Sequence, residues 1–322
     1  MTSIHPGDQL DHYRIERLVA RSGMASIFCA TDLNSGKQVA IKIPHPEVES
    51  DPVFFERFKR EQDIGTKLDH PGVMKVINED GHSRLYLVME WVEGRLLRQI
   101  LSEQGKLPQE RAIRIARAIC DTLDYIHSHG VAHRDLKPEN IMVDAEDRAK
   151  LIDFGIASSA GARRITFTKL SETMGTPDYI SPEQVKGKRG DARSDLFALG
   201  VMLYEMLTGK VPFQGSSAFE IMNDRLLNNP IPPREIDPAI PPQLQEIIYR
   251  ALERLPGNRY ATAREFARDL EHPEEVGVAE RPELRDWKRR KSPWLRRILL
   301  YIVLALIPIL VFALLLLVAK HT

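Results

Sequence analysis

Hydrophobic and polar residues alternate in short runs through residues 12–45 of the 322-residue chain. The runs read YRIERLVA, ASIFCATD and KQVAIKI, and NSGK separates the last two as a turn. A period of two is typical of half-buried strands, so this part predicts an antiparallel β-sheet. Residues 51–68 change to a helical period, and residues 84–92 return to a strand pattern.

After Gly94 the apolar residues recur mostly at helical spacing. Residues 108–130 carry one apolar stripe and end in Gly130, a common signal for the C-terminus of a helix. The stripe consists of Ala112, Ile115, Ala116, Ile119 and Leu123. Three further helices are predicted over 194–210, 241–254 and 262–271, the last with Thr262 at its N-cap. A small β-rich lobe therefore precedes a larger helical lobe, which is an α+β architecture.

Residues 298–319 contain no charged side chain and would span roughly 33 Å as a helix, enough to cross a bilayer. A buried core helix is the weaker interpretation, because soluble helices of this length keep a polar face. Basic residues precede the span at positions 288–291, 296 and 297, whereas only KHT follows it. This asymmetry predicts a single-pass inner-membrane protein whose large N-terminal part is cytoplasmic and whose C-terminus is outside. No N-terminal signal peptide is expected, since residues 1–18 lack an apolar stretch.

Composition narrows the functional classes further. The 45 basic and 45 acidic side chains cancel, so no overall field favours binding to nucleic acid. The two cysteines, Cys29 and Cys120, lie in apolar surroundings without the spacing of metal ligands. Both are expected to pack, reduced, in the interior.

The strongest chemical signal is VAHRDLKPENIMV at residues 131–143. It resembles the catalytic loop of protein kinases, H-R-D-x-K-x-x-N. The resemblance implies that Asp135 accepts or orients the proton of the attacking hydroxyl, that Lys137 neutralises charge on the transferred phosphoryl group, and that Asn140 ligates Mg²⁺. A lysine two residues after the aspartate resembles serine/threonine kinases, so Ser or Thr is the implied acceptor.

Two further segments fit the same family. KLIDFGIA at 150–157 resembles the D-F-G element, which implies that Asp153 is the second Mg²⁺ ligand, and QVAIKI at 38–43 implies that Lys42 holds the α- and β-phosphates. The acidic partner of this lysine is predicted to be Glu61, with Glu56 as the competing acid. The implied cofactors are ATP and Mg²⁺, with Mn²⁺ as a possible substitute.

The segment LYLVMEWVEG resembles the strand and hinge that hold adenine in kinases. The resemblance implies Met89 as gatekeeper and backbone groups of Glu90 and Val92 as hydrogen-bonding partners of the adenine edge. Ala40 and Met142 would close on the ring from either side. Taken singly, these apolar residues fit a protein core equally well, and only their spacing relative to the other motifs favours a nucleotide site.

The segment LVARSGMASIFCATD at 18–32 lies where the family has its phosphate-covering loop, G-x-G-x-x-G-x-V. Ala20, Ser22 and Ala25 occupy the glycine positions, and their loss is expected to cost about 1 kcal/mol in strain and five- to tenfold in nucleotide affinity. The backbone N–H groups that would cradle phosphate remain. The residues assigned to this nucleotide contact are Val19, Ala20, Ser22, Gly23, Met24 and Ile27.

A second departure from the family is Gly65, one turn after the predicted glutamate, where kinases pack an apolar side chain. A glycine in the middle of a helix costs about 1 kcal/mol and would leave that contact unfilled. We therefore expect this helix to need help in its active position, for instance from homodimerisation through the N-lobe.

GTPDYISPE at 175–183 resembles the end of a kinase activation segment. The resemblance implies a buried ion pair between Glu183 and Arg259, a role for Asp195 in holding the backbone of the catalytic loop, and a contact of Thr176 with that loop. A basic pocket at Arg134 would receive a phosphorylated loop residue. The predicted sites of autophosphorylation are Thr166 and Thr168.

The resemblance covers residues 11–272, and the group most similar is the bacterial transmembrane serine/threonine kinases of the eukaryotic-like type. The predicted organisation is an N-lobe with hinge (1–92), a C-lobe (93–272), a basic juxtamembrane linker (273–297), a transmembrane helix (298–319) and a short tail (320–322). Such a short tail is not expected to hold an external sensor. The alternative function is a membrane-tethered, nucleotide-binding pseudokinase scaffold, and a small-molecule kinase is disfavoured by the complete GTPDYISPE segment.

Overall fold

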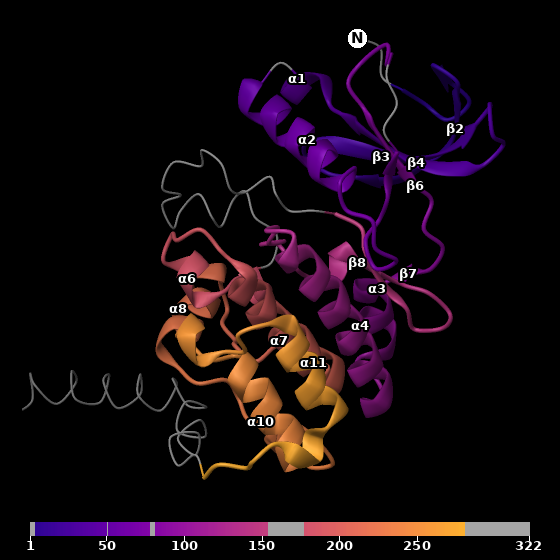
Figure 1. Ribbon diagram of the computed structural model, residues 1–322. Coiled ribbons are helices and arrows are strands. Elements are labelled where there is room, and N and C mark those ends of the chain that lie inside the picture. Colours follow the sequence, from indigo (N-terminus) through magenta and orange to yellow (C-terminus); the bar gives the residue numbers. More distant parts are fainter. Residues whose placement is uncertain (1–3, 50, 78–80, 154–176, 281–322) are drawn as a thin grey trace, which may run out of the picture. The chain divides into compact units, whose positions relative to one another are not determined.

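The computed structural model describes residues 4–49, 51–77, 81–153 and 177–280 (Figure 1). Most of them fall in one compact unit, Met1–Ala279. The rest of the chain, from Glu280 onward, clusters as a separate unit. The predicted phosphorylation sites Thr166 and Thr168, the predicted contact residue Thr176 and the predicted membrane span all lie outside the described residues.

The N-lobe is a six-stranded antiparallel sheet in the order β1-β2-β3-β4-β6-β5. The strands are β1 (Gln9–Leu10), β2 (Tyr13–Arg21), β3 (Ala25–Asp32), β4 (Gln38–Pro44), β5 (Val76–Ile77) and β6 (Leu87–Glu90). The predicted sheet is thus confirmed, although β6 is shorter than the predicted strand 84–92. Two helices, α1 (Pro46–Glu49) and α2 (Pro52–Gly65), follow β4, and α2 lies along the sheet in Figure 1.

The C-lobe is mainly helical, with a small sheet in the order β7-β8-β9. Its strands are β7 (Arg95–Leu96), β8 (Ile141–Val143) and β9 (Ala149–Leu151). Its α-helices are α3 (Leu97–Gln104), α4 (Gln109–Ser128), α6 (Pro182–Val185), α7 (Ala192–Thr208), α8 (Ala218–Leu227), α9 (Pro233–Ile236), α10 (Pro242–Ala251) and α11 (Ala263–Glu271). Short 3₁₀ turns cover Pro138–Asn140, Pro177–Tyr179, Pro256–Asn258 and Pro273–Glu275.

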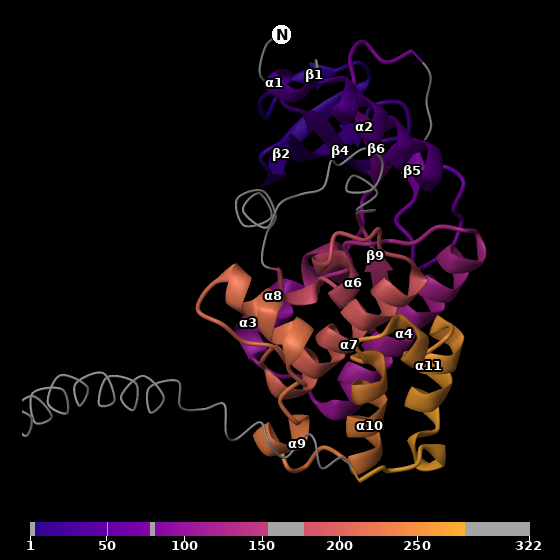
Figure 2. The same cartoon turned by 90° about the vertical axis from the view of Figure 1, so that its left-hand side faces the viewer.

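Helix α7 forms the centre of this lobe, and α4 and α10 pack directly against it (Figure 2). Every residue of α7 from Ser194 to Thr208 is buried, as expected for a helix that is apolar on all sides. The predicted stripe of α4 is buried against the same core. Thr262 caps α11 through the N–H of Glu265, and Gly130, with φ of 74°, follows the C-terminus of α4, as both signals predicted.

Both cysteines are buried, in agreement with the sequence prediction. Burial raises the pKa of the Cys120 thiol well above its usual range, and it also raises the pKa of Cys29. Neither thiol is therefore activated as a nucleophile.

Within the described ranges, no helix has the length and apolar character that crossing a membrane requires. Because residues 298–319 are not among them, the transmembrane helix stays a prediction.

Candidate active site

Three charged residues from separate parts of the sequence meet between the two lobes. Lys42 on β4 donates through Nζ to Oε1 of Glu61 on α2 at 2.7 Å. The same Nζ lies 3.4 Å from Oδ1 of Asp153, which follows β9. Glu56, the competing acid, is exposed. The structure therefore joins Lys42 to Glu61 and brings both to the predicted metal ligand Asp153.

Burial and mutual charge decide the protonation of this cluster. Burial opposes the charged form of Lys42, but the carboxylates of Asp153 and Glu61 outweigh it, so the pKa of Lys42 is raised. Burial also tends to raise the pKa of Asp153, but Lys42 outweighs it and the net direction is downward. For Glu61, burial is the largest influence and raises the pKa to about 7, with Asp153 adding to the effect. Lys42 and Asp153 are thus held charged at neutral pH.

The catalytic loop is held by Asp195 of α7. Its Oδ2 accepts from the backbone N–H of His133 at 2.8 Å, and its Oδ1 accepts from the N–H of Arg134 at 2.7 Å. Nε2 of His127 on α4 lies 2.8 Å from Oδ2. This places Asp195 in the architectural role that the sequence suggested. Arg134 is consequently fixed with a φ of 66°, a left-handed conformation that non-glycine residues adopt only when their surroundings enforce it.

The reactive side chains of that loop contact one another. Nζ of Lys137 donates to Oδ2 of Asp135 at 2.7 Å, and Nδ2 of Asn140 donates to the backbone carbonyl of Asp135 at 2.8 Å. Because the amide nitrogen of Asn140 is engaged in this way, its oxygen remains as the group able to ligate a cation. The Asp135 side chain remains accessible, with 39% of it exposed.

The residues predicted to hold adenine come from both lobes. Ala40 and Met89 are directly opposite each other on β4 and β6, and they share one apolar cluster with Ile27 and Val92. Met142 comes from β8 of the C-lobe sheet. Val92, Glu90 and Met142 also border a cavity of about 1020 Å³, but Lys42 and Asp153 are not among its lining residues. We therefore define the nucleotide site by the apolar cluster and the charged cluster together, and not by this cavity.

Glu90, at the start of the hinge, has a second role that the sequence did not reveal. Its Oε1 accepts from Nζ of Lys150 on β9 at 2.7 Å and from the N–H of Lys75 at 2.7 Å. Its own N–H donates to the carbonyl of Lys75. The hinge is therefore tied to both lobes.

The predicted phosphate loop is the tight connection between β2 and β3, and Ser22 closes it. The Ser22 hydroxyl accepts from the N–H groups of Met24 at 3.3 Å and Ala25 at 3.1 Å, while the N–H of Ser22 donates to the carbonyl of Ala25. Three of the amides expected to cradle phosphate thus have partners inside the loop. At the base of the loop, Ser26 Oγ lies 3.0 Å from Nε2 of His45, and the His45 N–H donates to the carbonyl of Met24.

The strain predicted for this loop is wrong. Positive φ among the described non-glycine residues occurs only at Asp11, Arg134 and Asp147, so neither Ala20 nor Ser22 is in a conformation that needs glycine. The Ser22 hydroxyl instead accepts hydrogen bonds from two of the amides that were expected to cradle phosphate. Val19, the neighbouring nucleotide contact proposed from sequence, is 44% exposed.

Replacing Ser22→Gly is expected to lower the Michaelis constant for ATP about fivefold, because one hydrogen-bonding competitor worth about 1 kcal/mol is removed. Ser22→Ala should reproduce most of the change if the hydroxyl is the cause. Ala20→Gly is the matched control and should leave the constant unchanged. Steady-state kinetics with ATP varied checks this, and an equal effect of both glycine substitutions would contradict it.

Gly65 departs from the prediction in two respects. It is the last residue of α2 and not a mid-helix position, so its cost to the helix is small. The space beside it is also not empty: a Cβ built on Gly65 would lie 2.2 Å from Cγ2 and 3.0 Å from Cβ of Val76 on β5. The side chain of Val76 therefore occupies the space beside Gly65. The phenylalanine of the D-F-G element, Phe154, which the predicted contact involves, lies outside the described residues, and dimerisation through the N-lobe stays a prediction.

Gly65→Ala is expected to destabilise the protein by about 1–3 kcal/mol, since the new methyl group must displace α2 or β5. Val76→Ala in the same chain should recover part of this loss by removing Cγ2, which a double-mutant cycle in urea would measure. Gly257→Ala, where the nearest other atom to the added Cβ is 3.9 Å away, is the matched control. Additive losses in the double variant would argue against the contact.

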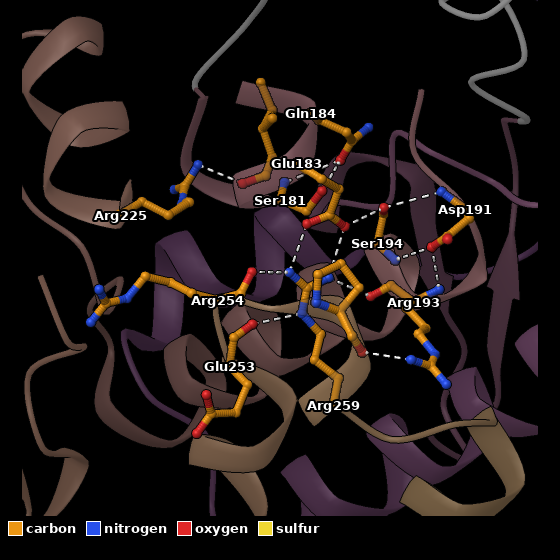
Figure 3. Close-up of polar contacts among 12 residues, drawn as sticks. Ser181, Glu183, Gln184, Asp191, Arg193, Ser194, Arg225, Glu253, Arg254 and Arg259 are labelled. Atoms are coloured by element: carbon orange, nitrogen blue, oxygen red, sulfur yellow. Dashed lines mark hydrogen bonds and ion pairs between the residues drawn. The ribbon is translucent and has the colours of Figure 1, made fainter. Parts of the chain in front are cut away.

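Residues 181–184 are held by polar contacts to other parts of the C-lobe (Figure 3). Oε1 and Oε2 of Glu183 accept from Nη1 and Nη2 of Arg259 at 2.8 and 2.7 Å, and Oε1 also accepts from Ser194 Oγ at 2.6 Å. Ser181 is fully buried and donates through its hydroxyl to Oε1 of Gln184 at 2.8 Å. These contacts give Glu183 and Arg259 the buried pairing that the motif implied.

Sequence reasoning missed a second network between this segment and the catalytic loop. Arg98 on α3 donates through Nε to Glu139 at 2.9 Å and through Nη1 to Glu205 of α7 at 2.8 Å, and it also bonds the Tyr179 hydroxyl. Tyr179 in turn donates to Glu205. Glu139 and Tyr179 lie within the two quoted motifs VAHRDLKPENIMV and GTPDYISPE, whereas Arg98 and Glu205 belong to neither. The motifs alone did not show that these residues are joined.

A β-sheet lobe and a helical lobe, with a Lys–Glu–Asp cluster between them and an Asp–Lys–Asn loop beside it, define the protein kinase domain. Residues 13–271 match the family model described as protein kinase domain. The chain belongs to this family. The fold is therefore the bilobal protein kinase fold, with the β-sheet N-lobe and helical C-lobe that the sequence predicted.

The chain is 37% identical over 269 residues to a probable serine/threonine-protein kinase PknB of Corynebacterium glutamicum, covering 81% of this chain and 42% of that protein. It is 36% identical over 271 residues to serine/threonine-protein kinase PknB of Mycobacterium tuberculosis, covering 82% and 43%. Among solved structures, it is similar to the kinase domain of Mycobacterium tuberculosis PknI in its C20A form, with 25% identity, a TM-score of 0.66, and coverage of 85% of this chain and 100% of that one. The chain thus spans about two fifths of the length of the curated relatives it matches.

Proposed function

We propose that this chain is a membrane-anchored serine/threonine protein kinase that transfers the γ-phosphoryl group of ATP to Ser or Thr of proteins. The observation that carries the proposal is the joint arrangement of the Lys42–Glu61–Asp153 cluster and the Asp135–Lys137–Asn140 loop. The kinases named among its relatives support the choice of acceptor.

The residues present fit ATP with a divalent cation. The amide oxygen of Asn140 and the carboxylate of Asp153 are hard oxygen donors of the kind that Mg²⁺ uses together with substrate phosphates. The described residues contain no group of three or more His, Cys, Asp or Glu side chains able to hold a metal alone, so phosphate oxygens would complete the ligand set. Bound Mg²⁺ would neutralise charge on the phosphates.

The positions of the site residues suggest what each would do in phosphoryl transfer. Lys42, held by Glu61, would bind the α- and β-phosphates, and the hinge at Glu90 and Val92 would orient the adenine. Asp135 would take the proton of the acceptor hydroxyl as its oxygen bonds to the γ-phosphorus and the bond to the ADP oxygen breaks. Lys137, 2.7 Å from Asp135, would offset the negative charge that develops on the transferred group.

The proposal is tested by incubating the purified 322-residue chain with γ-labelled ATP, Mg²⁺ and myelin basic protein as a generic acceptor. Label on the acceptor and on Thr166 or Thr168 of the chain itself, absent from Asp135→Asn, is expected. A chain that binds ATP but transfers no label at millimolar ATP would instead support the nucleotide-binding scaffold, an alternative that the self-closed Ser22 loop favours.

Localisation is part of the same proposal. The uncharged stretch at 298–319 and the basic residues before it support a single span with the kinase domain in the cytoplasm. The chain should sediment with membranes and resist extraction by high salt, whereas a variant lacking 298–319 should be soluble. Recovery of the intact chain in the salt wash would contradict the anchor.

A further inference from the structure

Arg225 on α8 is a fully buried arginine that holds the backbone of residues 177–180. Its Nη1 donates to the carbonyls of Pro177 and Ile180, both at 2.6 Å, and its Nη2 donates to the carbonyl of Asp178 at 2.5 Å. Figure 3 shows this side chain reaching the segment beside Ser181 and Glu183. One guanidinium therefore fixes three of four consecutive peptide groups.

The electrostatic setting of Arg225 differs from that of Arg259 in the same region. Arg259 forms a two-pronged pair with the Glu183 carboxylate, whereas Arg225 donates hydrogen bonds to three backbone carbonyls. Its Nε has no hydrogen-bond partner in the described part of the chain, and burial lowers its pKa to about 10. Its guanidinium carbon lies 5.4 Å from the centre of the Phe213 ring.

A buried cation with carbonyl partners is a costly way to fill this space. Part of that cost is offset, because the guanidinium satisfies three carbonyls and is attracted by the carboxylates of Asp178 and Asp224. What the arginine adds is a fixed position for the carbonyls at 177, 178 and 180.

The fixed segment touches the catalytic loop on its other side. Tyr179 is joined through Arg98 to Glu139, and Nε2 of Gln184 donates to the carbonyl of Arg134 at 2.8 Å. Asp135 lies in the sequence between these two points of contact, at 134 and 139. A shift of residues 177–184 would therefore change what lies beside Asp135, where an acceptor hydroxyl must arrive.

We propose that Arg225 is a positioning residue for the protein acceptor: it fixes the 177–180 backbone as the surface on which the acceptor chain is aligned with Asp135. The proposal rests on the proposed kinase function. The hydrogen bonds of Arg225 go to residues 177, 178 and 180 and not to the residues proposed to bind the nucleotide. Replacing Arg225 should therefore affect the protein acceptor and not ATP.

The test compares the full chain with Arg225→Met and Arg225→Lys, using myelin basic protein and ATP as the varied substrates. Arg225→Met should raise the Michaelis constant for the acceptor at least about tenfold, because a displaced 177–180 backbone loses contacts that bind the acceptor, and tenfold corresponds to about 1.4 kcal/mol of binding free energy. The Michaelis constant for ATP should stay within about twofold of the parent value. Arg225→Lys, which keeps one donor group, should recover part of the loss. Arg264→Met, whose partner is Asp124 at 2.7 Å and not the segment, is the matched control.

Urea unfolding of the same proteins distinguishes an effect on acceptor positioning from an effect on stability. Arg225→Met leaves three carbonyls without their donor and is expected to be less stable than the parent chain, so the kinetics are compared in urea-free buffer at a temperature where the unfolding curves show both proteins folded. Equal acceptor constants in parent and Arg225→Met would overturn the proposal, as would equal losses for acceptor and ATP. An inactive parent chain would instead refute the kinase function itself.

Discussion

Asp135→Asn is expected to lower kcat for protein phosphorylation by about 10²–10⁴-fold, the range associated with loss of a positioned general base. The amide keeps the size of the carboxylate but cannot take the proton of the acceptor hydroxyl. It also removes the charge that holds Lys137 Nζ at 2.7 Å. The Michaelis constant for ATP should change little, because the nucleotide contacts proposed for Lys42 and the hinge are left in place.

The measurement is the initial rate of label transfer with both substrates saturating. Asp237→Asn is a matched control, since Asp237 is also paired with a lysine, Lys106, at 2.7 Å but contacts none of the proposed catalytic residues. It should retain full activity. A rate for Asp135→Asn within tenfold of the parent would mean that Asp135 orients the acceptor without serving as base.

The charged residues of the site could be predicted because each belongs to a local pattern with fixed spacing. Lys42 ends an alternating strand, Asp153 follows a short apolar strand, and Asp135 and Asn140 lie within one loop. The choice of Glu61 over Glu56 rested on the resemblance of RFKRE at 57–61, ahead of LDHPGVMKV, to the corresponding segment of related kinases, and Glu56 is exposed in the structure. Each of these predictions rests on residues close together in the sequence, and the structure has these residues in the elements that the local patterns predicted.

The features that the sequence did not predict depend on contacts across long separations or on the choice of a hydrogen-bond partner. Nothing in the helix pattern around Gly65 shows that Val76, on a strand after the helix, fills the adjacent space. Ser22 was taken as a weak substitute for glycine, whereas its hydroxyl binds the loop's own amides. Arg225 lies in an amphipathic segment, and a polar residue there reads as solvent-exposed until the fold buries it.

Glu183→Gln is expected to destabilise the protein by about 3–5 kcal/mol at neutral pH, because it leaves the buried charge of Arg259 without its partner. The side chain of Arg259 is 0% exposed and packs 4.8 Å from the centre of the Phe197 ring. Its Nη groups would keep their bonds to the carbonyls of Arg193 and Arg254, but these carry no net charge. A loss of this size is a large part of the 5–15 kcal/mol that stabilises a typical domain.

The same pair sets a pH dependence with a definite sign. Burial opposes ionisation of Glu183, but the hydrogen bonds and charge of Arg259 outweigh it and lower its pKa from 4.5 to about 2. Because the folded protein binds this proton less readily than the unfolded chain, the stabilisation is complete above pH 4.5 and is lost as the pH falls toward 2. In Glu183→Gln this part of the acid dependence should disappear.

Urea unfolding between pH 3 and 7 measures both effects. Glu103→Gln, which removes an exposed partner of Arg95, is the control and should cost less than about 1 kcal/mol at every pH. Replacing both members, as Glu183→Leu with Arg259→Met, should recover much of the stability, since the cost lies mainly in the charge left unpaired and not in the loss of the pair itself. A single variant as stable as the parent, or a double variant no better than the single one, would show that this ion pair does not hold the segment in place.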